Sequence, residues 1–184
     1  MHPVDVAEHV AESVGVLRDR LAEHLGLAAD EPTLEADTRL YVPFVKTDRQ
    51  LVSQAVPSSL VLPGGGPTAF TYQVPLLGVP PLTRKLFLYL ELTDFDGQPP
   101  TAELLRADRT QLPAGEWPKA LGEQGIVRDH KEYGRPFFCR RGLREYHSHP
   151  EHEDDPWDRH REAVTLDALV IELLVALRDT WIGR

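Results

Sequence analysis

The sequence contains a single cysteine, Cys139, and no apolar run that approaches the eighteen or so residues of a membrane-spanning helix. A single thiol excludes an intrachain disulfide framework. The N-terminus also lacks the charged region, apolar run and small-residue cleavage site of a secretory signal peptide. Together these absences predict a soluble, cytoplasmic protein.

Basic residues are also in short supply: 20 lysines and arginines stand against 29 aspartates and glutamates, for a formal net charge of −9. A surface of this sign does not attract nucleic acid or anionic lipid without a strong basic patch. The densest basic cluster is Arg140, Arg141 and Arg144. We therefore expect neither nucleic-acid nor membrane binding, and we interpret the three arginines as a contact for an acidic partner or as a balance for nearby carboxylates.

The glycine-rich segment at residues 64–66 lacks the features of a phosphate-binding loop. The glycines Gly64, Gly65 and Gly66 are not followed by the lysine and Ser or Thr of such a loop, nor do they stand between a strand and a helix. Prolines flank them on both sides, and the sequence therefore predicts a hairpin turn.

The remaining chain has the pattern of one α+β domain covering residues 1–184. Apolar residues spaced by three and four predict an amphipathic helix over residues 4–25 and a C-terminal helix beginning after Thr165. Alternating apolar residues predict strands at 39–46 and 84–93, the second of them central in the sheet, and Pro43 suggests an edge or a bulge in the first. Further strands are predicted at 50–56, 59–62, 69–77 and 101–105.

The segment between strands and C-terminal helix concentrates groups that bind metals. Cys139, Glu145, His147 and His149 fall within eleven positions. Thiolate, imidazole and carboxylate are the ligands of zinc, and four protein ligands make a closed, structural site. If the segment is extended, Glu145, His147 and His149 alternate and leave the backbone on the same side. The pattern therefore predicts a zinc site in a loop.

A solvated acidic loop is the alternative interpretation of this segment. Glu151, Glu153, Asp154 and Asp155 surround the histidines, and a lone cysteine often behaves as a small buried hydrophobic residue. Under this interpretation the histidines lie at the surface and hold no ion.

The order of elements resembles the ubiquitin-conjugating, or E2-like, fold. In that family a histidine-led loop runs through a glycine to an apolar residue and the catalytic cysteine, as His130, Gly134, Phe138 and Cys139 do here. An aromatic residue and a proline follow, near Tyr146 and Pro150, and then a helix that corresponds to LDALVIELLVAL. The asparagine that usually follows the histidine is absent. The resemblance implies an antiparallel meander with a helix on each side in sequence, and a thioester nucleophile at Cys139.

The four candidate ligands also resemble the signature of a small bacterial family named for its Cys-Glu-His-His residues and predicted to bind metal. Cys139, Glu145, His147 and His149 supply those residues in order. The resemblance implies a component of a bacterial ubiquitin-like conjugation pathway, acting with an E1-like adenylating enzyme and a ubiquitin-like protein, in operons linked to antiphage defence.

Three functions follow from these features. The leading prediction is a zinc-binding E2-like protein of such a pathway, in which Cys139 is a ligand. The second is an active transferase that forms a thioester on Cys139, with His147 or His149 orienting or deprotonating the attacking group. The third is a zinc-dependent hydrolase with Glu145 as general base. His152 and His160 are spare in all three, although either is able to replace Glu145 as a ligand.

Overall fold

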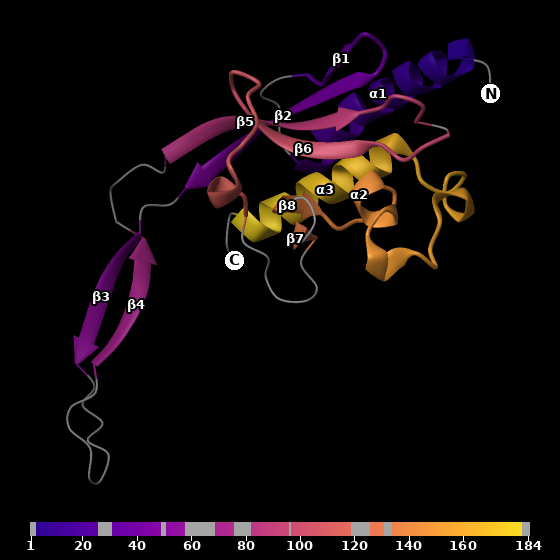
Figure 1. The fold of residues 1–184 in the computed structure, drawn as a ribbon. Coiled ribbons are helices and arrows are strands. Elements are labelled where there is room, and N and C mark those ends of the chain that lie inside the picture. The colour runs from indigo at the N-terminus through magenta and orange to yellow at the C-terminus, as the bar shows by residue number, and fades with distance from the viewer. Residues whose placement is uncertain are drawn as a thin grey trace. The chain divides into compact units, whose positions relative to one another are not determined.

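The computed structural model describes residues 3–25, 31–48, 51–57, 69–75, 82–95, 97–118, 126–130 and 134–181 (Figure 1). The chain divides into two compact units: one comprises Met1–Lys46 with Arg84–Arg184, and the other comprises Thr47–Thr83. Each is described by itself below. A single domain for residues 1–184 stays a prediction.

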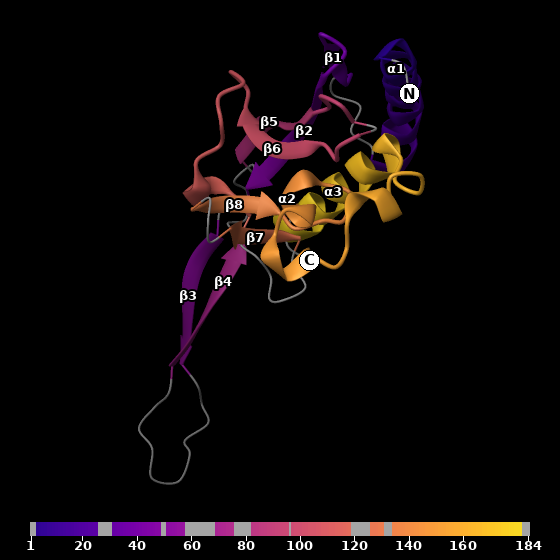
Figure 2. The same ribbon diagram turned by 45° about the vertical axis from the view of Figure 1, so that its right-hand side comes forward.

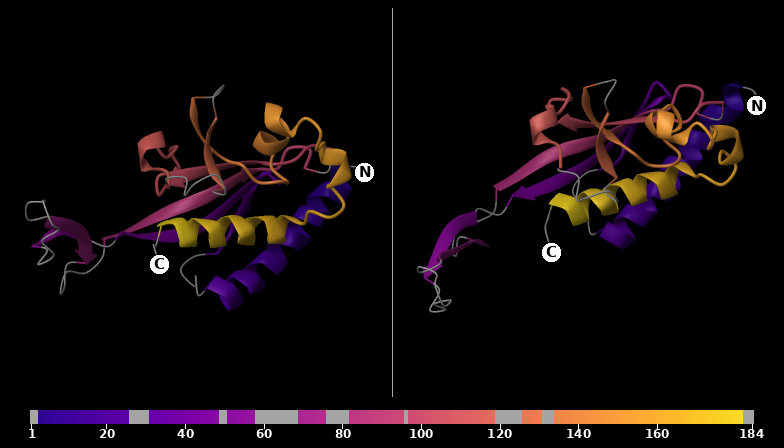
Figure 3. Two further views of the ribbon diagram at one scale, coloured as in Figure 1. Left: turned by 90° about the horizontal axis from the view of Figure 1, so that it is seen from below. Right: turned by 60° about the horizontal axis from the view of Figure 1, so that its bottom comes forward.

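Two long helices enclose the core of the first unit. Helix α1 spans Pro3–Leu25 and helix α3 spans Leu166–Trp181, as their apolar spacing predicts. The two helices contact each other and lie along the same face of the sheet (Figure 3). Their buried residues are those of the predicted stripes: Val10, Val14, Leu17 and Leu21 on α1, and Leu166, Leu169, Val170, Leu173, Leu174 and Leu177 on α3. No helix among the described residues is long and apolar enough to cross a membrane.

The sheet of this unit is four-stranded and antiparallel, in the order β1-β2-β5-β6. The strands span Thr33–Glu35, Arg39–Asp48, Leu82–Glu91 and Thr101–Arg106. Strand β5 lies between β2 and β6, so its predicted central position is confirmed. Strand β1 pairs with β2 from Arg39 to Tyr41. Pro43 lies beyond this pairing, on a part of β2 whose β1 side is an edge of the described sheet. The predicted α+β fold is confirmed.

The face of the sheet toward the helices is built from alternate residues, because successive side chains of a strand point to opposite faces. Leu86, Leu88, Leu90 and Leu92 of the β5 segment are at most 3% exposed. Leu40, Val42 and Phe44 of β2 and Ala102 and Leu104 of β6 join them in the core. The core therefore packs the strands in the middle of the chain against the two long helices, α1 and α3.

The second unit is an antiparallel hairpin. Strand β3, Leu51–Pro57, pairs with β4, Ala69–Pro75, in a register that runs from Leu51↔Pro75 to Pro57↔Ala69. Two of the predicted strands are thereby confirmed. The strand predicted at 59–62 and the turn predicted at the three glycines lie outside the described residues.

A short hairpin leads from the sheet to the candidate site. Strand β7, Val127–His130, pairs with β8, Arg135–Phe138, and β8 leads toward helix α2, Arg144–His147 (Figure 2). Two 3-10 turns, Pro150–His152 and Trp157–Arg159, then connect α2 with α3. A third 3-10 turn, Ala114–Glu116, follows β6.

Candidate functional site

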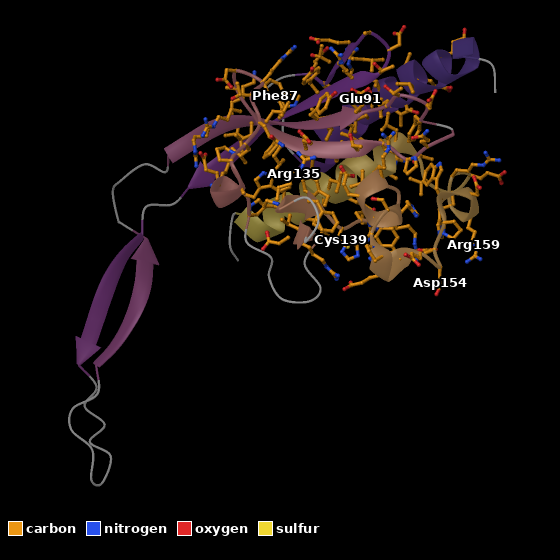
Figure 4. All side chains as sticks on the ribbon, viewed as in Figure 1. Phe87, Glu91, Arg135, Cys139, Asp154 and Arg159 are labelled. Carbon is orange, nitrogen blue, oxygen red and sulfur yellow. The ribbon has the colours of Figure 1, made fainter. Side chains whose placement is uncertain are left out.

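Cys139 lies immediately after β8 and is half-buried. The preceding Phe137 and Phe138 are buried, and the backbone N–H of Cys139 donates to the carbonyl oxygen of Ile126 at 2.6 Å. Figure 4 shows Cys139 below the sheet that carries Phe87 and Glu91, toward the segment of Asp154. This hydrogen bond at the end of the hairpin therefore holds the backbone of Cys139 in place.

The segment after Cys139 includes a helical turn, so the extended conformation on which the convergence of Glu145, His147 and His149 depends is not present. Residues 144–147 form one helical turn, in which each residue is rotated by about 100° from the last. Glu145 and His147 therefore leave the backbone about 200° apart. His149 follows the helix in extended conformation. On a helical turn, a spacing of two residues places Glu145 and His147 on different sides, so these two side chains do not converge.

Glu145 points to the outer edge of the sheet and is 8% exposed. Its carboxylate accepts a hydrogen bond from the backbone of Ala102 on β6, next to the place where Arg144 N–H donates to Pro100 O at 2.8 Å. Burial raises the pKa of Glu145 to about 7. Its atom Oε2 is buried and has no hydrogen-bond partner among the described residues. Glu145 thus covers a backbone donor at the sheet edge.

His147 holds two parts of the loop together. Its Nε2 accepts from Gly142 N–H at 3.2 Å, and its Nδ1 lies 2.7 Å from the carbonyl oxygen of Asp155. Because a ring nitrogen that accepts carries no proton, Nδ1 is the donor to Asp155. Burial lowers the pKa of His147, which favours this neutral form. Both ring nitrogens are therefore engaged by the backbone.

The residue that approaches the thiol is His152. Its Nε2 lies 3.6 Å from Cys139 Sγ. Burial raises the pKa of the Cys139 thiol, and Arg128 opposes this effect. Burial lowers the pKa of His152, as does the neighbouring His149. The resting pair is therefore a neutral thiol beside a neutral imidazole, which is able to accept the thiol proton.

His149 lies near this pair and has other contacts. Its Nδ1 accepts from Glu151 N–H at 3.2 Å. Its ring stacks on Phe137 with centroids 5.8 Å apart, and lies at the same centroid distance from His152. His149 is therefore a ring neighbour of His152, the residue that approaches the thiol.

A cavity of about 410 Å³ opens on another side of Cys139. Arg140 and Arg141 form part of its wall, and both are paired within the chain: Arg140 with Glu172 at 2.6 Å, and Arg141 with Asp155 at 2.9 Å. These pairs agree with the interpretation of the arginines as a balance for carboxylates. Glu172 also lines the cavity, and the remaining wall comes from Tyr146, Ala163, Val164, Thr165, Ala168 and Leu169.

Two of the predicted zinc ligands have other partners in this structure. Glu145 is hydrogen bonded at the sheet edge, and both nitrogens of His147 are engaged by the backbone. Among the residues that the structure describes, no group of three or more His, Cys, Asp or Glu side chains is placed to hold a metal ion. Among the described residues, the imidazole placed within hydrogen-bond distance of the Cys139 thiol is that of His152. Zinc binding by Cys139, Glu145, His147 and His149 stays a prediction.

Spacing alone does not single out His152, which lies thirteen residues after Cys139. The turn at α2 and the following 3-10 turn return the chain to the thiol, and that path depends on the helical conformation we did not predict. His130 lies on β7 opposite Arg135 of β8, and its side chain is outside the described part of the structure.

One comparison with known proteins bears on this segment. The family model described as Y4jH-like, of the Y4jH family, matches residues 120–175. The match includes the β7–β8 hairpin, Cys139, the cavity wall and the first part of α3, and it excludes α1 and the four-stranded sheet. Comparison of the chain with curated proteins gave no match.

Proposed function

We propose that the protein is an E2-like transferase that carries an acyl group as a thioester on Cys139. One observation carries this proposal: a half-buried thiol lies 3.6 Å from an imidazole nitrogen at the wall of a cavity. A nucleophile within reach of a base is the usual arrangement of covalent acyl transfer. His152, rather than His147 or His149, takes the role of base.

The proposed reaction transfers an acyl group twice. The Cys139 thiol gives its proton to His152 Nε2 while Sγ attacks the carbonyl carbon of a donor thioester. The new carbon–sulfur bond to Cys139 forms, the bond to the donor sulfur breaks, and the departing thiolate takes the proton from His152. An acceptor amine then attacks the Cys139 thioester. The carbon–nitrogen bond forms, the carbon–sulfur bond breaks, and the amine proton returns to the thiol.

The fold and the local sequence support this proposal. The thiol follows a short hairpin beside an antiparallel sheet and precedes a buried C-terminal helix, which is the order of elements that the E2-like resemblance implies. By the same resemblance, the donor is an E1-like enzyme loaded with a ubiquitin-like protein. No step of the proposed reaction uses a metal ion.

A small donor tests the chemistry without the partner proteins. We expect a peptide that ends in Gly-Gly, activated as a mercaptoethanesulfonate thioester, to add one acyl group to the protein by intact mass. The adduct is expected to disappear with excess dithiothreitol, whose thiol takes the acyl group and frees Cys139, and to be absent in Cys139→Ala. His152→Ala is expected to form it about tenfold more slowly or worse, because it lacks the proton acceptor. Equal rates for wild type and His152→Ala would overturn the role of the pair.

The partner is tested separately. With the E1-like enzyme, the ubiquitin-like protein and ATP, we expect a reducible adduct of the ubiquitin-like protein on Cys139 on a nonreducing gel. Acylation by the peptide without acylation by the ubiquitin-like protein would retain the chemistry and reject the pathway. Failure of both would reject the transferase.

A further inference from the structure

We propose that Tyr146 is a positioning residue, whose ring holds the His152 imidazole toward Cys139. The inference rests on the proposed function, since it names the residue that prepares the base. Tyr146 lies on α2, six residues before His152, and its hydroxyl group donates to Asp155 rather than to Cys139.

The two rings form a close parallel stack. Their centroids are 3.9 Å apart and their planes differ by 14°. A half-buried imidazole on a 3-10 turn has several accessible rotamers, and most of them turn Nε2 away from a given target. The flat contact with Tyr146 restricts the ring plane, and in that plane Nε2 lies 3.6 Å from Cys139 Sγ. The stack therefore selects the orientation that the proton transfer needs.

Tyr146 is in turn fixed at its hydroxyl group. The Tyr146 O–H donates to Asp155 Oδ2 at 2.9 Å, and the same oxygen accepts from Arg141 Nε at 2.9 Å. The other carboxylate oxygen of Asp155 contacts His160 Nε2. Asp155 thus joins Tyr146 to the arginine at the cavity wall and to the turn before α3. The stacking surface for His152 is therefore anchored at its hydroxyl end.

Four variants separate positioning from general structure. Tyr146→Leu removes the ring, Tyr146→Phe keeps the ring and removes the hydroxyl group, and His152→Ala removes the base. Tyr89→Leu is the matched control, because it makes the same change at a tyrosine whose ring packs on Tyr41 of the sheet and whose hydroxyl group donates to Glu91. The rate of Cys139 alkylation by iodoacetamide is measured for each, together with the melting temperature.

We expect Tyr146→Leu to slow alkylation by about tenfold, as His152→Ala does, while Tyr89→Leu stays near wild type. Tyr146→Phe keeps the ring and loses its hydroxyl anchor, so its rate is expected to lie between those of Tyr146→Leu and wild type. Because Tyr146 acts through His152, the double variant is expected to be no slower than His152→Ala alone. Imidazole added to the solution is expected to restore part of the rate in His152→Ala. An unchanged rate in Tyr146→Leu, or losses that multiply in the double variant, would overturn the proposal.

Alkylation also distinguishes this inference from the proposed function. It needs no acyl donor, so it reports the coupling of Tyr146, His152 and Cys139 even if the protein accepts no thioester. A fall in alkylation without any acylation of the wild type would retain the positioning role and reject the transferase. Acylation of the wild type with normal alkylation of Tyr146→Leu would retain the transferase and reject the positioning role.

Discussion

Replacing Glu145 with glutamine is expected to change how the stability of the protein depends on pH. The carboxyl group is 8% exposed, and burial raises its pKa from 4.5 to about 7. The folded protein therefore binds the Glu145 proton more tightly than the unfolded chain does. This contribution is fully present below pH 4.5 and is lost as the pH rises through 7. The pKa difference corresponds to about 3 kcal/mol between these limits.

The assay is urea unfolding followed by tryptophan fluorescence at pH 5 and pH 8, in buffer with chelator. Between these values we expect wild type to lose about 2 to 3 kcal/mol more than Glu145→Gln, because only wild type ionises at this position. The glutamine amide keeps an acceptor for Ala102, and any cost of its unpaired N–H₂ group is the same at both pH values.

Glu103→Gln is the matched control. Glu103 lies near Glu145 but pairs with Arg135, and its side chain is 24% exposed. Its removal is expected to retain most of the pH difference. Parallel pH profiles for wild type and Glu145→Gln would refute the reasoning, since they would mean that the buried carboxyl group is not the source of the effect.

Three further results are expected. If Cys139 is the nucleophile of the proposed transferase, thiol titration and elemental mass spectrometry are expected to find one titratable thiol per chain and no zinc bound to it. Stoichiometric zinc lost in both Cys139→Ser and Glu145→Gln would instead establish the predicted ligand set. Leu173→Ala is expected to reduce the free energy of unfolding by about 2–5 kcal/mol in urea titration, because Leu173 is fully buried. Gly142→Ala is expected to lower it by about 1–3 kcal/mol, since φ is +98° there and the new Cβ would lie 3.0 Å from Val164; Val164→Ala in the same chain should recover only the steric part.

The long periodic elements of the fold were predictable from the sequence. Helices α1 and α3 follow apolar spacing over many turns, and β5 repeats leucine at every second position. Such patterns indicate burial of one face against a large core, and they are long enough to be recognised from the sequence alone. The strands of the β3–β4 hairpin were predicted for the same reason.

The candidate site was predictable only in part. Cys139 and its histidine-rich surroundings were identified, because composition is visible in the sequence. The partner of the thiol was not, because four residues of helix carry no periodic signal. Docking of α2 on β6 decides their conformation: Arg144 N–H and the Glu145 carboxylate engage the edge of the strand. A tertiary contact therefore determines which histidine reaches the thiol.

The packing of α3 determines whether the segment matched by the family model can fold independently. Residues 120–175 include the hairpin, the thiol and most of the buried stripe of α3. That stripe is covered by α1 and by the leucines of β5, which the match excludes. Excised by itself, the segment would expose this apolar surface to water and is not expected to be an autonomous folding unit. Any protein that shares it must supply an equivalent sheet and helix, from its own chain or from a second one.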